Sequence, residues 1–351
     1  MRTMRLRERI RKAARGKNGF GFCCSALICL KREGAGATGE LIARHREERA
    51  FERATRKSLK PDPSEYESQR RESEAADGPV FSITVPLFNT SETFLRDMIQ
   101  SVRKQSWQKW ELLLADGSDA GHPDVRVPCE AAAREDPRIR YRKLEKNGGI
   151  SENSNAALEM ATGEYIALLD HDDLLIPSAL WEVAQAIRET GADFLYSDEA
   201  VFESPNPGKI LEIHRKAEFN QKKLLTENYL CHLTVFRREL VERAGGFRKE
   251  YDGSQDHELF LRLTDEAGKV VHIPKALYFW RSHGGSVAAD IGAKDYAVDA
   301  GKRAVKDFLR ERKGIEAEVR SSEECATIYE VKILHCVQDD TGDQEIDRWR
   351  N

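Results

Sequence analysis

The sequence predicts an α/β fold in which a mostly parallel sheet is flanked by helices. Strand-like and helix-like segments alternate from Val80 onward. The strand-like segments are apolar on both faces, as strands buried in a parallel sheet are. Acidic residues follow several of these strands directly, and ligands of such sheets bind beyond the carboxyl ends of the strands. A chain of 351 residues is long enough for one large domain with extensions.

The elements are expected in a fixed order along the chain. Residues 80–85 form a first strand, and Ser91 caps a helix whose apolar positions follow a helical period. Later elements are a strand at 110–115, a strand at 138–141, a helix from Ser151 to Met160, a strand at 164–169, a helix at 177–190, strands at 193–197 and 233–236, helices at 238–244 and 256–263, and an extended segment at 270–280. We therefore divide the chain into a basic, partly helical extension at 1–79, an α/β domain at 80–290, and a helical extension with an irregular tail at 291–351.

The net charge of -4 conceals a basic amino-terminal segment. Residues 1–60 carry 17 Lys and Arg against 6 Asp and Glu. Within it, residues 40–75 are expected to be helical with a break at Pro61 and Pro63, because proline ends a helix. A solvated extension explains this charge; the alternative is a peripheral contact with an anionic membrane. We expect no nucleic-acid partner.

The cysteines and the length of the apolar runs favour a cytoplasmic location. The apolar run Phe20–Leu30 has 11 residues, whereas a membrane-spanning helix needs about 20. The seven cysteines are odd in number and form no C-x-x-C pair, which suits reduced thiols and argues against a zinc site. We expect a cytoplasmic protein, located at the inner membrane face if the basic segment binds lipid.

Asp170-His171-Asp172-Asp173 follows the strand at 164–169 directly. Alternate carboxylates at a strand end can point the same way, and Mg²⁺ and Mn²⁺ prefer oxygen ligands. A metal held there would neutralise a departing diphosphate. An acidic turn in which Asp172 or Asp173 caps the next helix is the alternative.

Two further turns have the composition of binding loops. Asp116-Gly117-Ser118 ends a strand, where a carboxylate could accept hydrogen bonds from a base or a ribose; a plain turn is the alternative. Asn147-Gly148-Gly149-Ile150-Ser151 offers backbone N–H groups at a helix start. A lone Gly-Gly turn is weak support for a phosphate site.

Together these motifs resemble family 2 glycosyltransferases of the GT-A fold. The resemblance covers about residues 80–290, and it rests on the order of the motifs along the chain. The motifs are Val85-Pro86-Leu87-Phe88-Asn89, Asp116-Gly117-Ser118, Asn147-Gly148-Gly149-Ile150-Ser151 with Asn155, Leu168-Leu169-Asp170-His171-Asp172-Asp173, Tyr196-Ser197-Asp198-Glu199, Asn228-Tyr229-Leu230-Cys231-His232, Arg237-Arg238, Gly253-Ser254-Gln255-Asp256 and Tyr278-Phe279-Trp280-Arg281-Ser282-His283.

The resemblance implies an inverting transfer from a nucleotide-diphospho-sugar, of UDP or dTDP type, to a hydroxyl of a glycan or lipid-linked glycan. Polysaccharide or cell-surface glycan assembly is the implied setting. Asp256 would be the general base, and Asp172 and His283 would bind Mn²⁺ or Mg²⁺. The residues that the resemblance assigns to the nucleotide-sugar are Pro86, Phe88, Asn89, Asp116, Gly149, Asn155, Asp170, His171 and Arg281.

Two positions depart from the family pattern. Ala115 stands where members usually carry a first acid, and Gln255 stands where a Glu is common. Without the resemblance, Asp256 would be interpreted as a helix cap and His283 as a loop histidine.

Two alternative functions remain open. The first is a magnesium-dependent phosphohydrolase or nucleotidyltransferase. A phosphohydrolase would have an acid after the first strand, and a nucleotidyltransferase would have a glycine-rich basic loop there. This chain has Pro86-Leu87-Phe88-Asn89 at that place. A catalytically silent, sugar-binding GT-A domain is the other alternative, although Asp172, Asp256 and His283 are all retained.

Overall fold

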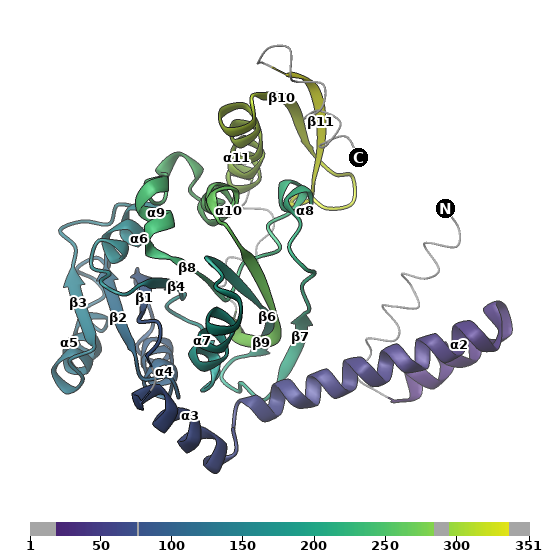
Figure 1. Cartoon of the computed structure of the whole chain (residues 1–351), viewed down its shortest axis with the longest axis horizontal. Coiled ribbons are helices and arrows are strands. Elements are labelled where there is room, and N and C mark those ends of the chain that lie inside the picture. The colour runs from purple at the N-terminus through teal and green to yellow at the C-terminus, as the bar shows by residue number, and fades with distance from the viewer. Residues whose placement is uncertain (1–18, 76, 284–294, 337–351) are drawn as a thin grey trace. The chain divides into compact units, whose positions relative to one another are not determined.

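The computed structural model describes residues 19–75, 77–283 and 295–336 (Figure 1). The chain divides into two compact units, one up to Lys57 and one from Ser58. Helix α2 spans Gly19–Ser58, and α3 spans Pro63–Ala75. The helix break predicted at Pro61 and Pro63 is therefore confirmed. Part of the basic segment, residues 1–18, lies outside the described residues. No helix within the described ranges is long and apolar enough to cross a membrane.

The second unit is built on a nine-stranded sheet, counted over the described residues, in the order β3-β2-β1-β4-β8-β6-β9-β5 with β7 beside β6. Its strands are β1 (Phe81–Leu87), β2 (Trp110–Asp116), β3 (Ile139–Lys143), β4 (Tyr165–Leu168), β5 (Leu174–Leu175), β6 (Phe194–Glu203), β7 (Ile210–His214), β8 (Thr234–Arg237) and β9 (Val270–Ser282). Strands β3, β2, β1 and β4 are parallel, as are β6 and β9. Only β5, β7 and β8 of this described sheet run against these six, so the predicted mostly parallel sheet is confirmed.

Helices accompany the strands along the chain, and three of them, at residues 126–135, 221–226 and 249–251, were not predicted from the sequence. The helices are α4 (Glu92–Arg103), α5 (Arg126–Glu135), α6 (Ile150–Leu158), α7 (Ala179–Thr190), α8 (Gln221–Thr226), α9 (Arg238–Ala244), the 3₁₀ turn η1 (Lys249–Tyr251), α10 (Gln255–Glu266) and α11 (Asp295–Lys313). Ser91 caps α4 as expected, because its Oγ accepts a hydrogen bond from Phe94 N at 3.3 Å. Helix α6 packs on β1 and β2, and α7 packs on β9.

The carboxyl-terminal part differs from the irregular tail expected after the helical extension. Helix α11 is present, but it is followed by an antiparallel hairpin of β10 (Ile315–Ser321) and β11 (Tyr329–Cys336). Ile315 and Ala317 are buried with a period of two, and this alternation over few residues was the missed signal. Figure 1 shows α11 beside α10 and the hairpin beside α11, and the ring of Tyr329 on β11 stacks on His257 of α10. Residues 337–351 lie outside the described residues.

One apolar core joins the second half of the sheet to these carboxyl-terminal elements. Its members come from β6, β8, α10, α11 and the hairpin, and include Phe194, Phe236, Leu259, Phe260, Val305, Phe308, Leu309, Ile315 and Tyr329. Burial of such side chains stabilises the start of α10, where Asp256 lies. The domain boundaries expected at residues 79 and 290 stay predictions.

Candidate active site

The first part of the site lies at the carboxyl ends of β1 and β2, which pair in register so that Leu87 is opposite Asp116. The buried carboxylate of Asp116 accepts hydrogen bonds from Ser118 N at 2.8 Å and Tyr141 Oη at 2.7 Å. Burial and this bond to Asp116 raise the pKa of Tyr141, so the phenol stays a donor. Asn89 N donates to Ser118 Oγ at 2.9 Å, which joins the two strand ends.

The predicted nucleotide residues therefore gather at one edge of the sheet. Pro86 is half-buried near the end of β1, and Asn89 follows the strand with a φ of 49°. Phe88, between them, is 44% exposed, which is unusual for a phenylalanine at the end of a buried strand. An exposed aromatic face at this edge is available to a planar base.

The turn before α6 is closed by a carboxylate of the protein itself. Gly149 adopts a φ of 97°, and a Cβ there would lie 2.8 Å from Asp252 Oδ2. Asp252 Oδ1 accepts hydrogen bonds from Ser151 Oγ at 2.5 Å and Ser151 N at 3.3 Å. Ser151 was expected to cap this helix; instead Gly149 is the N-cap and the Ser151 hydroxyl donates to Asp252. The helix start thus already holds an anionic group.

Asn155 has a similar role on the next turn of α6. Its side-chain amide exchanges two hydrogen bonds with the backbone of Phe247, one from Nδ2 to the carbonyl and one from the N–H to Oδ1, each 2.8 Å long. These bonds join α6 to the segment after α9. The predicted contacts of Gly149 and Asn155 with a nucleotide-sugar stay predictions.

The acidic turn Asp170–Asp173 lies directly after β4. The side chain of Asp170 is 50% exposed, and its Oδ2 lies 3.2 Å from His232 Nε2. Burial alone would raise the pKa of Asp170, but the contact with His232 outweighs it and lowers the pKa. His171, one-third exposed, places Nδ1 3.8 Å from Asp172 Oδ1. Asp170 therefore presents an ionised carboxylate that is held on one side.

Asp172 and Asp173 connect this turn to β9. His283 Nε2 lies 2.9 Å from Asp172 Oδ2, and both side chains are about one-fifth exposed. Asp173 is buried and accepts hydrogen bonds from Tyr278 Oη at 2.7 Å and Arg281 N at 2.6 Å. Burial and the neighbouring acids raise the pKa of Asp173 well above its usual range. Asp173 thus anchors the turn, while Asp172 and His283 converge at its accessible side.

Arg281 supports the same turn from within the protein. Its fully buried guanidinium lies between Phe94 and Phe202, with ring centroids at 4.4 and 5.0 Å. Its Nε donates to the carbonyl of Asp172 at 2.5 Å. Among the described residues, Nη1 has no hydrogen-bond partner. Arg281 therefore positions Asp172 through the backbone, and its direct contact with a phosphate stays a prediction.

Asp256 lies at the start of α10 and is held by a neighbouring loop. Its Oδ2 accepts a hydrogen bond from Asn228 Nδ2 at 3.0 Å, and its Oδ1 accepts from His257 N at 2.9 Å. Asn228 begins a segment, residues 228–232, that ends at His232. This segment therefore contacts Asp256 at one end and Asp170 at the other.

From the sequence, His232 was interpreted only as a core or acceptor-site residue, and Glu199 and Lys216 were given no role. Glu199 on β6 lies 3.4 Å from His232 Nδ1 and 3.2 Å from Lys216 Nζ. Burial alone would lower the pKa of His232, but Asp170 and Glu199 outweigh it and raise the pKa well above its usual range. Glu199 and His232 belong to motifs that carry the family resemblance. Those motifs were the signal by which the two residues could have been found.

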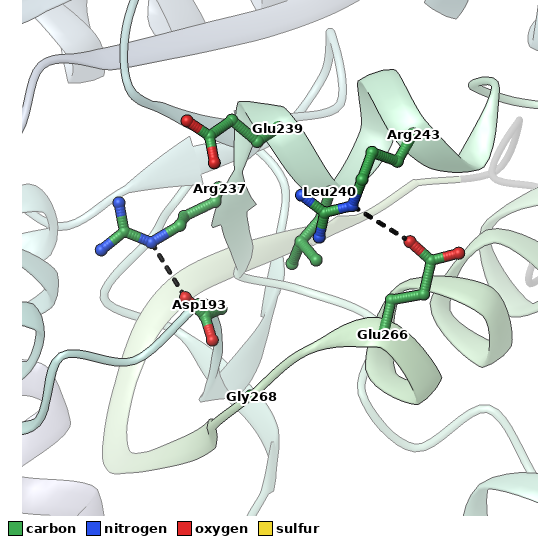
Figure 2. A pocket seen from close by; sticks show the side chains of 7 residues that line it. All are labelled: Asp193, Arg237, Glu239, Leu240, Arg243, Glu266 and Gly268. Carbon is green, nitrogen blue, oxygen red and sulfur yellow. Dashed lines mark hydrogen bonds and ion pairs between the residues drawn. The ribbon is translucent and has the colours of Figure 1, made fainter.

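A cavity of about 380 Å³ lies at the other end of the strands, between the start of β6 and the end of β8 (Figure 2). Its two arginines are already paired, Arg237 with Asp193 at 2.9 Å and Arg243 with Glu266 at 3.6 Å. The predicted site residues, all within the described part of the chain, do not line it. This cavity is separate from the candidate active site.

No group of three or more His, Cys, Asp or Glu side chains that could hold a metal is found within the described ranges. Asp172 and His283 nevertheless bring one carboxylate oxygen and one imidazole nitrogen together, a donor set suited to Mn²⁺. A metal at this position would need its remaining ligands from a bound diphosphate and from water.

Comparison with known proteins identifies relatives of the chain. Residues 82–245 match the sequence profile described as Glycosyl transferase family 2. The chain is 42% identical over 241 residues to the uncharacterised protein y4gI of Sinorhizobium fredii, a match that covers 68% of this chain and 26% of that protein. It is 34% identical over 249 residues to the O-antigen biosynthesis protein RfbC of Myxococcus xanthus, over 69% of this chain and 19% of that protein. The chain thus spans about a quarter or less of these relatives.

Solved structures resemble the fold. Residues 1–349 of S. aureus TarS, in complex with UDP-GlcNAc, superpose with a TM-score of 0.54 at 19% identity. The match covers 66% of this chain and 66% of that chain. At this identity the likeness shows that the two chains share a fold.

Proposed function

Because residues 82–245 belong to glycosyl transferase family 2, we propose that this chain transfers a hexosyl group, with inversion, from a nucleotide-diphospho-sugar to a hydroxyl of a glycan or lipid-linked glycan. The observation that carries the proposal is the segment 228–232, which contacts the candidate base Asp256 and the acidic turn at Asp170. The residue proposed to take the acceptor's proton and the turn proposed to bind the donor would then both lie beside this segment. The similarity to RfbC supports a role in glycan assembly.

The donor would bind along the carboxyl edge of β1, β2 and β4. Phe88 is exposed and offers a ring on which a base can stack. Asn89 is the next residue, and Asp116 lies opposite Leu87 on the neighbouring strand. The diphosphate would lie at Asp170–Asp172, with Arg281 holding the backbone of Asp172 in place. A phosphate oxygen is also the kind of acceptor that the unpartnered Nη1 of Arg281 lacks among the described residues. Since TarS binds UDP-GlcNAc, we propose a uridine or thymidine donor.

Asp172 and His283 would hold a divalent cation, Mn²⁺ or Mg²⁺. When bound, the cation would neutralise the charge that develops on the leaving diphosphate. For this role His283 must be neutral, so that Nε2 offers a lone pair in place of its hydrogen bond to Asp172. Arg281 and Asp173 keep the backbone of the turn fixed while the donor binds.

Asp256 would act as the general base. The acceptor oxygen attacks the anomeric carbon and gives its proton to the Asp256 carboxylate, while the bond from that carbon to the diphosphate breaks. This single displacement inverts the anomeric centre. Asn228 donates to Oδ2 and so orients the carboxylate, and each carboxylate oxygen retains a further lone pair for the proton. Location in the cytoplasm, at the inner membrane face, is part of this proposal.

A thermal-shift panel tests the proposed function. The intact chain is mixed with nucleoside mono- and diphosphates and with nucleotide-sugars, each with Mn²⁺ or with a chelator. We expect a uridine or thymidine diphosphate and its sugar to raise the unfolding temperature with Mn²⁺, because a ligand at 100 times its Kd stabilises by about 2.7 kcal/mol. No shift with any nucleotide-sugar would refute the proposal.

Product analysis separates the alternatives. A transferase releases a nucleoside diphosphate from the bound nucleotide-sugar, whereas a nucleotidyltransferase releases pyrophosphate from a nucleoside triphosphate and a sugar phosphate. A silent sugar-binding domain would bind the nucleotide-sugar and release neither product, with glycan or lipid-linked acceptors present.

A further inference from the structure

A histidine bridges the acidic turn and a buried glutamate. His232 Nε2 lies 3.2 Å from Asp170 Oδ2, and His232 Nδ1 lies 3.4 Å from Glu199 Oε2. The two carboxylates differ in exposure: the Asp170 side chain is 50% exposed and the Glu199 side chain is 4% exposed. One end of the bridge is therefore inside the protein, and the other reaches the accessible site.

The buried end of this bridge is held by further charged groups. Glu199 lies 2.7 Å from His214 Nδ1 and 3.2 Å from Lys216 Nζ, and Lys216 is itself buried. Lys216 Nζ also donates to the carbonyl of Leu230 at 2.6 Å and to the carbonyl of His232. Lys216 and Glu199 thus both hold the backbone of His232, and Glu199 Oε2, which accepts from His232 N at 3.3 Å, also lies within ion-pair distance of the ring.

The face of the His232 ring is fixed as well. Tyr278 stacks on it with centroids 4.6 Å apart and an interplanar angle of 20°. The hydroxyl of Tyr278 accepts from Asp170 N at 3.2 Å and donates to Asp173 Oδ2 at 2.7 Å. Tyr278 therefore aligns the ring of His232 with the backbone of the acidic turn.

We propose that His232, supported by Glu199 and Lys216, is a positioning residue that fixes the carboxylate of Asp170 for the donor. This rests on the proposed function, since it names how one donor-binding residue is oriented. Without this contact, the half-exposed side chain of Asp170 would be free to adopt several rotamers. Holding it in one rotamer removes that ordering cost from donor binding, and an imidazolium offsets negative charge where an anionic diphosphate must approach.

Two substitutions of His232 separate its two contacts. The amide nitrogen of asparagine can take the place of Nδ1, and that of glutamine can take the place of Nε2. His232→Asn thus keeps the contact with Glu199 and loses Asp170, whereas His232→Gln keeps the contact with Asp170. A neighbouring pair gives the matched control: His272 Nε2 lies 2.9 Å from the buried Asp198 on the same strand β6, and it stacks on Tyr196.

Ligand-free crystal structures test the positioning directly. We expect the Asp170 carboxylate to leave its place or split into several conformers in His232→Asn, and to stay in place in His232→Gln and in His272→Gln. An unchanged Asp170 in His232→Asn would overturn the proposal. This comparison needs no nucleotide-sugar, so it is decided even if the proposed function fails.

A double-mutant cycle tests the link to the donor, with UDP-GlcNAc and Mn²⁺ as the probe in calorimetry. We expect His232→Asn and Asp170→Asn each to weaken binding about tenfold, and the double variant to be no weaker than either alone. His272→Gln combined with Asp170→Asn should show additive effects. Additive effects of the His232 and Asp170 changes would overturn the proposal, and absence of binding by the wild-type chain would refute the donor assignment instead.

Discussion

The two halves of the sheet build the candidate site in different ways. In the half formed by β3, β2, β1 and β4, the strands are parallel, and Asn89, Asp116 and Asp170 follow directly after β1, at the end of β2 and after β4. In the half formed by β8, β6 and β9, strand directions are mixed. There the site residues come from a loop, from a helix start and from the end of β9.

This difference separates the residues that topology brings together from those that depend on contacts between distant segments. Parallel strands bring their carboxyl ends to one edge, so the topology alone gathers the donor residues. The second half contributes through three pairings between segments far apart in the chain: Asn228 with Asp256, His232 with Asp170, and His283 with Asp172. Under the proposed function, the first half would bind the donor, and the second half would take the proton and orient the groups of the first.

The largest expected effect is that of Asp256→Asn. Loss of a general base lowers turnover by about 10²- to 10⁴-fold, whereas donor affinity should stay within about twofold because binding belongs to the other half. The asparagine can still accept from Asn228, so the fold is kept. Turnover and calorimetry on the same preparation measure both quantities.

Asp265→Asn is the matched control for this variant. It lies in the last turn of the same helix α10 and pairs with Lys313. It should transfer sugar like the wild type. Full activity of Asp256→Asn would end its assignment as base, and a large loss of donor binding would break the division between the halves.

A smaller effect is expected from Asp172→Ala. Removing one of two protein ligands should weaken the Mn²⁺-dependent binding of UDP about 100-fold, since even outer-sphere partners of a metal contribute about 10- to 100-fold. Calorimetry with UDP, with and without Mn²⁺, measures this difference. Asp136→Ala, at the C-cap of α5 and paired with Arg138, is the control. Unchanged Mn²⁺-dependent binding in Asp172→Ala would rule out the metal role.

The first half of the fold was predictable because its signals are local. Apolar runs mark β1, which continues one residue past Pro86, and β2, which ends at Asp116. A capping serine, Ser91, marks the start of α4. The match of residues 82–245 to the family 2 profile and the likeness of the fold to TarS agree with the predicted family and fold. Asp116 and Asp170 could be proposed as site residues because each comes at the end of a predicted strand, although the side chains that contact them could not be predicted.

The second half was less predictable because its contacts are not local. Nothing in the spacing of Asp170 and His232 indicates that they meet, and Asp252 takes a position at α6 that the sequence assigned to Ser151. The hairpin at β10 and β11 was missed because its strands are partly exposed and carry charged residues between the apolar ones. Such pairings depend on how the elements pack, which local patterns do not contain.

The smallest expected effect concerns the pH dependence of the second half. The bond with Glu199, together with Glu212, raises the pKa of His214 to about 9, against about 6.5 in an unfolded chain. A raised pKa in the folded state means that this stabilisation is fully present below about pH 6.5 and is lost as the pH rises through about 9. The opposite sign holds for Glu199, whose pKa lies well below its usual range because Lys216 and the histidines outweigh its burial. Its contribution is present above about pH 4.3 and is lost in acid.

Calorimetric unfolding of the wild type and of His214→Gln from pH 6 to pH 10 tests this assignment. Because the His214 side chain is 36% exposed, water screens the pair, and we expect the unfolding temperature of the wild type to fall by only about 2 °C more than that of the variant. Glu212→Gln removes the second partner of His214, at 3.6 Å. The fall in its unfolding temperature should lie between that of the wild type and that of His214→Gln. If the unfolding temperatures of all three proteins changed with pH in the same way, the ion pair of His214 with Glu199 would not contribute to stability.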